Sequence, residues 1–171
     1  GWMAGPRPQR SVVFLAVTAE EKGLLGSEYY ASNPLYPLET TVAVINVDGA
    51  ATMGPSRDFG IYGSADVQLL DQLIDVAGRW DVRYTPDSKP EAGLFFRSDH
   101  FPFAKRGVPA VSYGAGQDWV DGGLEAGRAA AAEYNVNRYH QQADEWQPEW
   151  TFTGAARDLE ILYTLGSELA N

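Results

Sequence analysis

The sequence has no cysteine and only two histidines, His100 and His140, among its 171 residues. Without cysteine there are no disulfides or thiolate ligands, so any metal must be held by aspartate, glutamate and histidine. No apolar run approaches the roughly 20 residues of a membrane-spanning helix. Residues 1–6 show neither the basic end nor the apolar stretch of a secretion signal, which leaves the cellular location open.

Positive charge is also scarce. The chain carries 13 lysines and arginines against 23 aspartates and glutamates, a formal net charge of −10. This balance disfavours nucleic acids and anionic membranes as partners, because both repel an acidic surface. The length and the 44% share of hydrophobic residues fit one globular domain with a buried core.

Apolar runs and amphipathic stretches alternate along the chain, which predicts an α/β layered domain. The predicted strands are 10–18, 41–47, 58–63, 82–84 and 108–113, and the predicted helices are 20–32, 65–80 and 152–169. The last helix is expected to bury the stripe Ala155, Leu159, Leu162 and Leu165. Residues 86–103 are expected to form a loop, and residues 117–150 to be mostly irregular apart from an alanine-rich piece near Ala129.

Two adjacent acids, Glu20 and Glu21, directly follow the first predicted strand. In open α/β sheets, active sites lie at the carboxyl ends of strands. A carboxylate pair there suits metal-assisted hydrolysis, in which one acid holds the metal and its neighbour moves protons. The alternative is an ordinary helix start, whose first turn favours acidic side chains.

Polar groups follow two later strands or lie in the loops. Asp48 ends the second predicted strand, where the alternative is a turn-forming aspartate. Ser98, Asp99 and His100 are consecutive, but members of a hydrolase triad meet in space rather than in sequence, so the alternative is a polar loop. His140 lies in a polar loop, and imidazole together with carboxylates suits Zn²⁺.

The order of these motifs resembles the co-catalytic zinc aminopeptidases of the bacterial leucyl-aminopeptidase type, which are related to glutamate carboxypeptidase and glutaminyl cyclase. The matching segments are 13–27, with Glu-Glu-Lys-Gly-Leu-Leu-Gly-Ser, and then 46–48, 97–100, 107–110 and 139–140. The resemblance implies a three-layer α/β/α sandwich with a mostly parallel mixed sheet. It also implies an enzyme that releases N-terminal residues from peptides with zinc-activated water.

The resemblance further implies a role for each matched residue. Glu20 would be the general base and Glu21 a ligand of one zinc. Asp48 and His140 would be ligands of the other zinc. The remaining matched residues would support the site or contact the substrate, with Tyr139 beside the tetrahedral intermediate: Ser98, Asp99, His100 and Tyr139.

Two further zinc ligands of that family, a histidine in a His-x-Asp motif and a bridging aspartate, have no counterpart before the Glu20-Glu21 pair. We therefore expect residues 11–171 to be an N-terminally truncated catalytic domain, and residues 1–10 to be an extension or a remnant of cloning. An incomplete ligand set predicts weak or absent zinc binding by this chain. Missing strands predict an exposed sheet edge and a homo-oligomer, which a monomer in light scattering would contradict.

Two other functions remain open on the sequence. One is an esterase acting on small activated esters, with Ser98 as the candidate nucleophile. The other is an inactive, oligomeric remnant that serves as a binding module.

Overall fold

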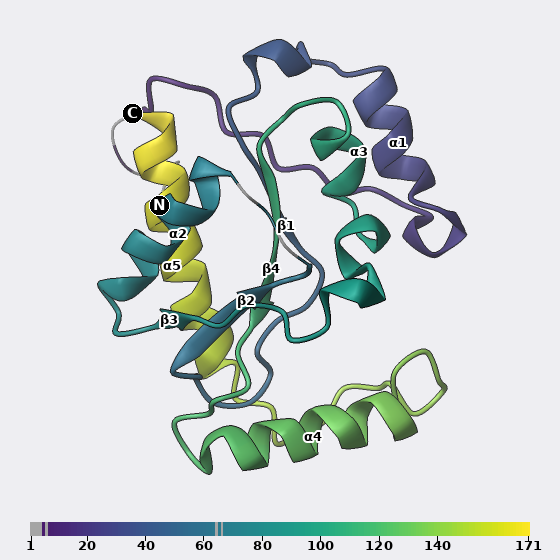
Figure 1. The fold of residues 1–171 in the computed structure, drawn as a ribbon, viewed down its shortest axis with the longest axis vertical. Helices are drawn as coiled ribbons and strands as arrows, with labels where there is room; N and C mark the ends of the chain where they lie inside the picture. The colour runs from purple at the N-terminus through teal and green to yellow at the C-terminus, as the bar shows by residue number, and fades with distance from the viewer. Residues whose placement is uncertain (1–4, 6, 64, 66) are drawn as a thin grey trace.

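A computed structural model describes residues 5, 7–63, 65 and 67–171, and within them a four-stranded mixed sheet (Figure 1). The strand order is β1-β4-β2-β3. The strands are β1 (Val44–Val47), β2 (Asp58–Ile61), β3 (Arg83–Tyr84) and β4 (Ala110–Ala115). The pairs β1–β4 and β2–β3 are parallel, and β2–β4 is antiparallel. The sheet is therefore mixed and mostly parallel, as predicted.

One face of the sheet is covered by α2 (Gln68–Gly78) and α5 (Thr153–Ala170), which lie side by side in Figure 1. Alternate strand residues point to this side, because successive side chains of a strand face opposite ways. They join Leu73 of α2 and Ile161 of α5 in the main core, whose strand members are Phe59, Ile61, Val111 and Tyr113. Leu73 and Ile161 are both fully buried.

The other face carries α1 (Leu25–Ser32) and α3 (Phe101–Ala104), which pack around a smaller core of Ala31, Phe103 and Val108. Glu28 of α1 ties the two helices together. Its carboxylate accepts a hydrogen bond from Lys105 Nζ at 2.7 Å and pairs with the Arg106 guanidinium at 2.5 Å. Helices on both faces complete the expected three-layer α/β/α arrangement.

The first predicted strand, residues 10–18, is wrong: this segment is extended but belongs to no sheet. Hydrogen bonds hold it at its two ends, from Arg10 N to Ala170 O at 2.8 Å and from Gly26 N to Thr18 O at 2.9 Å. Its apolar side chains are partly in solvent, with Phe14 81% exposed. An apolar run predicts burial, but a strand also needs a neighbour to take up its backbone hydrogen bonds.

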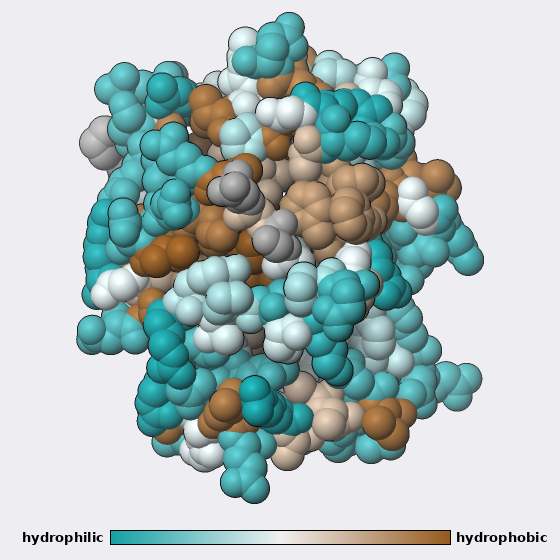
Figure 2. Space-filling view, in the orientation of Figure 1, coloured by the Kyte–Doolittle hydropathy of each residue, from teal (hydrophilic) through white to brown (hydrophobic). Residues whose placement is uncertain are grey.

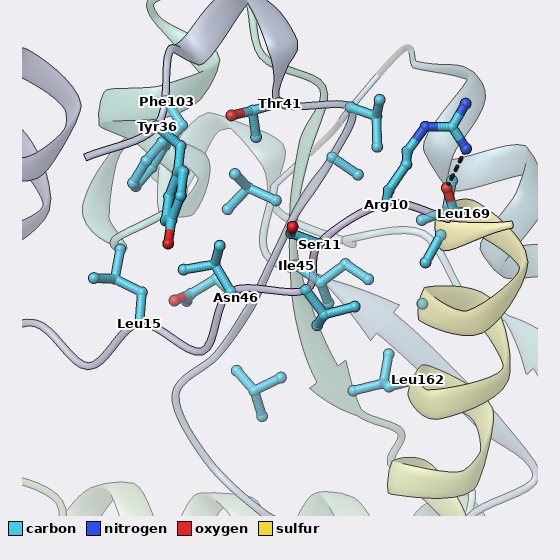
Figure 3. A pocket seen from close by; sticks show the side chains of 18 of the residues that line it. Arg10, Ser11, Leu15, Tyr36, Thr41, Ile45, Asn46, Phe103, Leu162 and Leu169 are labelled. Carbon is cyan, nitrogen blue, oxygen red and sulfur yellow. Dashed lines mark hydrogen bonds between the residues drawn. The ribbon is translucent and has the colours of Figure 1, made fainter. Parts of the chain in front are cut away.

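A cavity of about 860 Å³ runs along β1, beneath this segment (Figure 3). Its lining comes from both layers of the fold, with Phe103 on one side and Leu162 on the other. The cavity therefore wraps around the outer strand of the sheet, and its lining includes Asn46 and Asp99. In the space-filling view, hydrophobic side chains gather in the middle of the face that is shown, within a hydrophilic border (Figure 2).

A fifteen-residue helix, α4 (Gly123–Asn137), occupies part of the region predicted to be mostly irregular. It lies at the bottom of the view in Figure 1, and Gly127 is its only buried residue. A Cβ at Gly127 would lie 1.9 Å from the Gln117 carbonyl oxygen, so only glycine permits this contact. The sequence predicted a helix only near the alanines, because most α4 side chains are exposed and the helix therefore has no long apolar stripe.

Two further expectations need correction. Residues 86–103 are not one loop but hold η3 (Pro90–Ala92), η4 (Leu94–Arg97) and the start of α3. The buried stripe of α5 contains Ile161 in place of Leu159, which is 62% exposed. Residues 1–4 and 6 of the expected extension lie outside the described residues, and Arg10 is bonded to the end of α5. No helix in the described ranges is long and apolar enough to cross a membrane.

Candidate active site

Glu20 and Glu21 form the tight turn η1 (Glu20–Lys22), immediately before α1. Ala19 on one side has a left-handed φ of 58°, and Gly23 on the other has a φ of 98°. A left-handed alanine is uncommon, and such residues concentrate where a site constrains the backbone. Gly26 packs closely against the residue before this turn, because a Cβ at position 26 would lie only 2.5 Å from the Thr18 carbonyl oxygen.

Asp48 lies just beyond the carboxyl end of β1 and is held by two side chains. Asn46 donates to its Oδ1 from Nδ2 at 2.9 Å, and the Ser98 hydroxyl donates to its Oδ2. Asn46 also lies within hydrogen-bonding distance of the Ser98 hydroxyl, at 2.8 Å, and of the Ser112 hydroxyl, at 3.1 Å. Ser98 and Ser112 are buried, so this network sets the Asp48 carboxylate on the sheet.

Asp99 and His100 point to different environments although they are neighbours in sequence. Asp99 is half-buried and accepts a 2.5 Å hydrogen bond from the Ser27 hydroxyl of α1. His100 is fully buried, with its ring edge-on to Phe95 at a centroid distance of 4.8 Å. Burial lowers the pKa of His100 to about 4, so it is neutral near pH 7. Ser98, with its hydroxyl buried and engaged by Asp48, is poorly exposed for nucleophilic attack.

Tyr139 and His140 follow α4 and bring its end to the Glu20-Glu21 turn. The His140 Nε2 atom lies 2.7 Å from the Glu21 carboxylate, and the Tyr139 ring stacks on the imidazole at a centroid distance of 3.8 Å. His140 takes a left-handed φ of 60°. His140 and Glu21 are therefore in contact although they lie 119 positions apart in the sequence.

Several charged side chains act on Glu20. Partial burial raises the pKa of Glu20, and the carboxylates of Glu21, Asp99 and Asp48 raise it further. The imidazole of His140 acts in the opposite direction. Interactions of this kind fall off with distance, so Glu21, Asp99, Asp48 and His140 are the charged neighbours of Glu20, an acidic cluster in the electrostatic sense.

The donor types in this cluster suit zinc, but the described residues do not complete a zinc site. Zinc in catalytic sites takes three protein ligands of the histidine and carboxylate type. Within residues 5, 7–63, 65 and 67–171, no three such side chains are placed to hold one ion. The Glu21–His140 pair contributes two donors, and Asp48 is engaged by Asn46 and Ser98.

Three residues of the site were not singled out by the sequence patterns: Asn46, Ser27 and Tyr62. Asn46 precedes Asp48 by two positions, and strand alternation alone puts both on one face. Ser27 lies within the Gly-Leu-Leu-Gly-Ser block, next to the glycine that approaches Thr18. Tyr62 directly follows β2, and its pKa is raised by burial and by Asp48 and Tyr139.

The chain matches peptidase family M28 over residues 3–164. It is 30% identical, over 125 residues, to a probable glutamate carboxypeptidase of Arthroderma benhamiae, covering 67% of this chain and 17% of that relative. The chain thus spans about a sixth of the length of this relative.

A solved aminopeptidase structure shares the fold. The LapA aminopeptidase of Legionella pneumophila superposes with a TM-score of 0.61 at 15% identity, covering 90% of this chain and 38% of that one. BSAP, a zinc aminopeptidase from Bacillus subtilis, aligns over 80% of this chain and 38% of that one, with a TM-score of 0.43 and 18% identity. The family match extends over nearly the whole chain, from before the Glu20-Glu21 turn into α5, and the protein is a member of peptidase family M28.

Proposed function

We propose that this chain carries the general base and part of the zinc-binding residues of an aminopeptidase-type hydrolase, which releases N-terminal residues from peptides. Membership of a peptidase family supports hydrolysis of peptide bonds. The observation that carries the proposal is the acidic cluster around Glu20, with Glu21, Asp48, Asp99 and His140 as its electrostatic neighbours.

Glu20 is the residue best suited to move protons. Burial and the neighbouring carboxylates raise its pKa above the usual range of a glutamate. A base with a raised pKa takes a proton more readily and still returns it to a leaving group. Glu20 would accept a proton from the attacking water and deliver it to the amine released when the peptide bond breaks.

The substrate class follows from charge. Glu21, Asp48 and Asp99 give the site a negative field, which favours a cationic group at its entrance. The free α-ammonium group of a peptide is such a group, and the net charge of −10 acts in the same direction. An N-terminal amine next to the bond under attack therefore fits this site better than an internal peptide bond.

Glu21, Asp48 and His140 are the donors that we assign to zinc. A complete site of this class lowers the pKa of a zinc-bound water to about 7. The described residues provide no three-donor group. Tight zinc binding therefore requires further donors. Neither ester hydrolysis through Ser98 nor a non-enzymatic role is favoured by a specific contact, and both are outcomes of the test below.

The test is hydrolysis of a panel of amino-acid 4-nitroanilides and short-chain esters, with added zinc and with a chelator. We expect Glu20→Gln to lower kcat for the anilides by about 10²–10⁴-fold, because general-base assistance is lost. Glu39→Gln, on the short helix η2 (Leu38–Thr40), is the matched control and should leave kcat unchanged.

Three results would redirect the proposal. Equal turnover by the wild type and Glu20→Gln removes Glu20 as the base. Ester hydrolysis that resists the chelator supports the esterase. No turnover of any substrate, with calorimetry detecting no zinc binding, supports a binding module.

A further inference from the structure

The cavity along β1 lies at an edge of the sheet that no strand of the described residues covers, because β1 ends the strand order. Val44 N donates to Pro109 O at 2.9 Å, so the backbone groups of Val44 face β4. Successive residues of a strand direct these groups to opposite sides. Those of Ala43 and Ile45 therefore face away from β4, toward the cavity that both residues line. This edge is open to an added strand.

The cavity has the size and the walls of one strand position. In a layered sheet, strands lie about 4.8 Å apart, layers about 10 Å apart, and each residue advances about 3.3 Å, so a covered strand residue occupies roughly 160 Å³. The 860 Å³ of the cavity therefore match about five strand residues. Phe103 of α3 lines the cavity on one side, and Leu162 and Leu169 of α5 line it on the other (Figure 3). A strand placed here is covered on both faces, so it has to be apolar on both.

Residues 12–17 have the composition of such a strand. Val-Val-Phe-Leu-Ala-Val is an unbroken apolar run, which is the pattern of a strand buried on both faces. In the structure the segment is extended, belongs to no strand and lies along the cavity, which Val13, Leu15 and Val17 line. Six of the eight residues at positions 11–18 are exposed. Within a single chain this run therefore remains largely in solvent, although its pattern is that of a central strand.

We propose that a second copy of this chain fills the cavity with its own residues 11–18, and that the exchange is mutual. The strand order across the dimer is then β1, the partner's segment, the chain's own segment and the partner's β1. A two-fold axis passes between the two segments, which run antiparallel, and a contact of this kind closes at two copies. The backbone groups of Ala43 and Ile45 gain hydrogen-bond partners, and both segments become central strands. This inference is independent of the proposed function.

The exchange buries enough surface for a stable dimer. An extended residue exposes roughly 150 Å² in an unfolded chain. Two eight-residue segments that are about half exposed, with the walls that they cover, therefore remove on the order of 2,000 Å² from water, and stable interfaces bury about 1,200–2,000 Å². Among the described residues that line the cavity, only Arg10 and Asp99 are charged, so most of the net charge of −10 on each copy lies elsewhere.

The first test measures the mass in solution by light scattering over a dilution series, and we expect twice 18.7 kDa at the concentrated end. Val13→Lys puts a charge into the covered strand and should raise the dissociation constant of the dimer by on the order of 10³-fold. Val13 is 49% exposed in one chain, so the variant should keep the circular dichroism spectrum of the wild type. Leu35→Lys is the matched control, because Leu35 is 82% exposed and does not line the cavity. A wild type that is monomeric throughout overturns the inference, and so does equal weakening by the two variants.

The second test locates the contact. The chain has no cysteine, so a single introduced cysteine can form a disulfide only with its own copy. Near a two-fold axis between antiparallel strands, a residue lies about 5 Å from its copy, which is close enough for a disulfide. Mild oxidation should therefore cross-link at least one of three variants in the middle of the segment, and should leave Leu35→Cys uncross-linked: Val13→Cys, Phe14→Cys and Leu15→Cys. A dimer that none of the three cross-links uses another surface and overturns the inference. A monomer that binds an added apolar strand peptide has a different occupant in the cavity, which overturns it as well.

Discussion

The site has two halves that are built differently. The strand-borne half consists of side chains set on or against the sheet and linked by hydrogen bonds: Asn46, Asp48, Ser98 and Ser112. The turn-borne half consists of side chains on η1 and after α4: Glu20, Glu21, Tyr139 and His140. In the first half the two serines are buried, whereas in the second the Glu21 and His140 side chains are 64% and 53% exposed.

The two halves differ in how strongly the fold holds their side chains in place. The strand-borne half fixes the Asp48 carboxylate through buried groups, which are costly to leave without partners. The turn-borne half is joined by an exposed pair, which contributes little to stability. The side chains of the strand-borne half are therefore held in place more strongly than those of the turn-borne half. Substitutions in the two halves should differ in their effect on stability, and three predictions test this.

The largest effect is expected at His100, which is buried next to the strand-borne half. Its folded-state pKa of about 4 lies below the ordinary value of 6.5, so the unfolded chain binds more protons between these two pH values. The free energy of unfolding should fall by about 3 kcal/mol as the pH drops from 6.5 to 4. His100→Leu should remove this part of the pH dependence, as measured by denaturant unfolding at several pH values.

His140→Leu is the matched control, because it removes the exposed histidine of the turn-borne half. It should keep the acid sensitivity of the wild type. If the free energy of unfolding depends on pH in the same way for His100→Leu, His140→Leu and the wild type, burial of His100 does not cause the loss of stability in acid.

A smaller effect is expected at Asn46. Asn46→Ala removes the amide that reaches Asp48, Ser98 and Ser112, so each of two buried hydroxyls loses one hydrogen-bond donor. We expect the free energy of unfolding to fall by about 2 kcal/mol. Asn137→Ala, at the exposed end of α4, should cost about 0.5 kcal/mol or less. Equal losses at the two positions would contradict the comparison of the two halves.

The smallest effect is expected at Glu21. Glu21→Gln breaks the pair with His140, and the free energy of unfolding at pH 7 should change by about 1 kcal/mol or less, since exposed ion pairs contribute little. A loss as large as that of Asn46→Ala would show that the turn-borne half is as firmly built as the other half.

The sequence predicted the strand-borne half better than the turn-borne half. A buried apolar run rich in β-branched residues predicted β1, and Asp48 follows it as expected. The register that places Tyr62 beside Ser112 is a long-range pairing, and local pattern does not determine it. The Glu20-Glu21 pair was identified from its motif, but its place on a supposed strand end was wrong, because residues 10–18 lack a pairing strand.

The position of His140 could not be predicted from local pattern. It depends on α4, whose mostly exposed side chains give no apolar stripe. His140 was expected to act with Asp48, and its nearest acid is Glu21. The predicted homo-oligomer, and the roles of these residues toward zinc, stay predictions.

Helix α4 connects a pair of glycines to the residues that face Glu21. The helix begins at two glycines with left-handed backbone, Gly122 and Gly123, and fifteen residues later it ends beside Tyr139 and His140. At 1.5 Å per residue its length is about 22 Å, so a tilt of about 10° at the glycines moves the far end by about 4 Å. That displacement exceeds the reach of a hydrogen bond. A binder that tilts α4 through its outer surface would therefore separate His140 from Glu21 without contacting either residue.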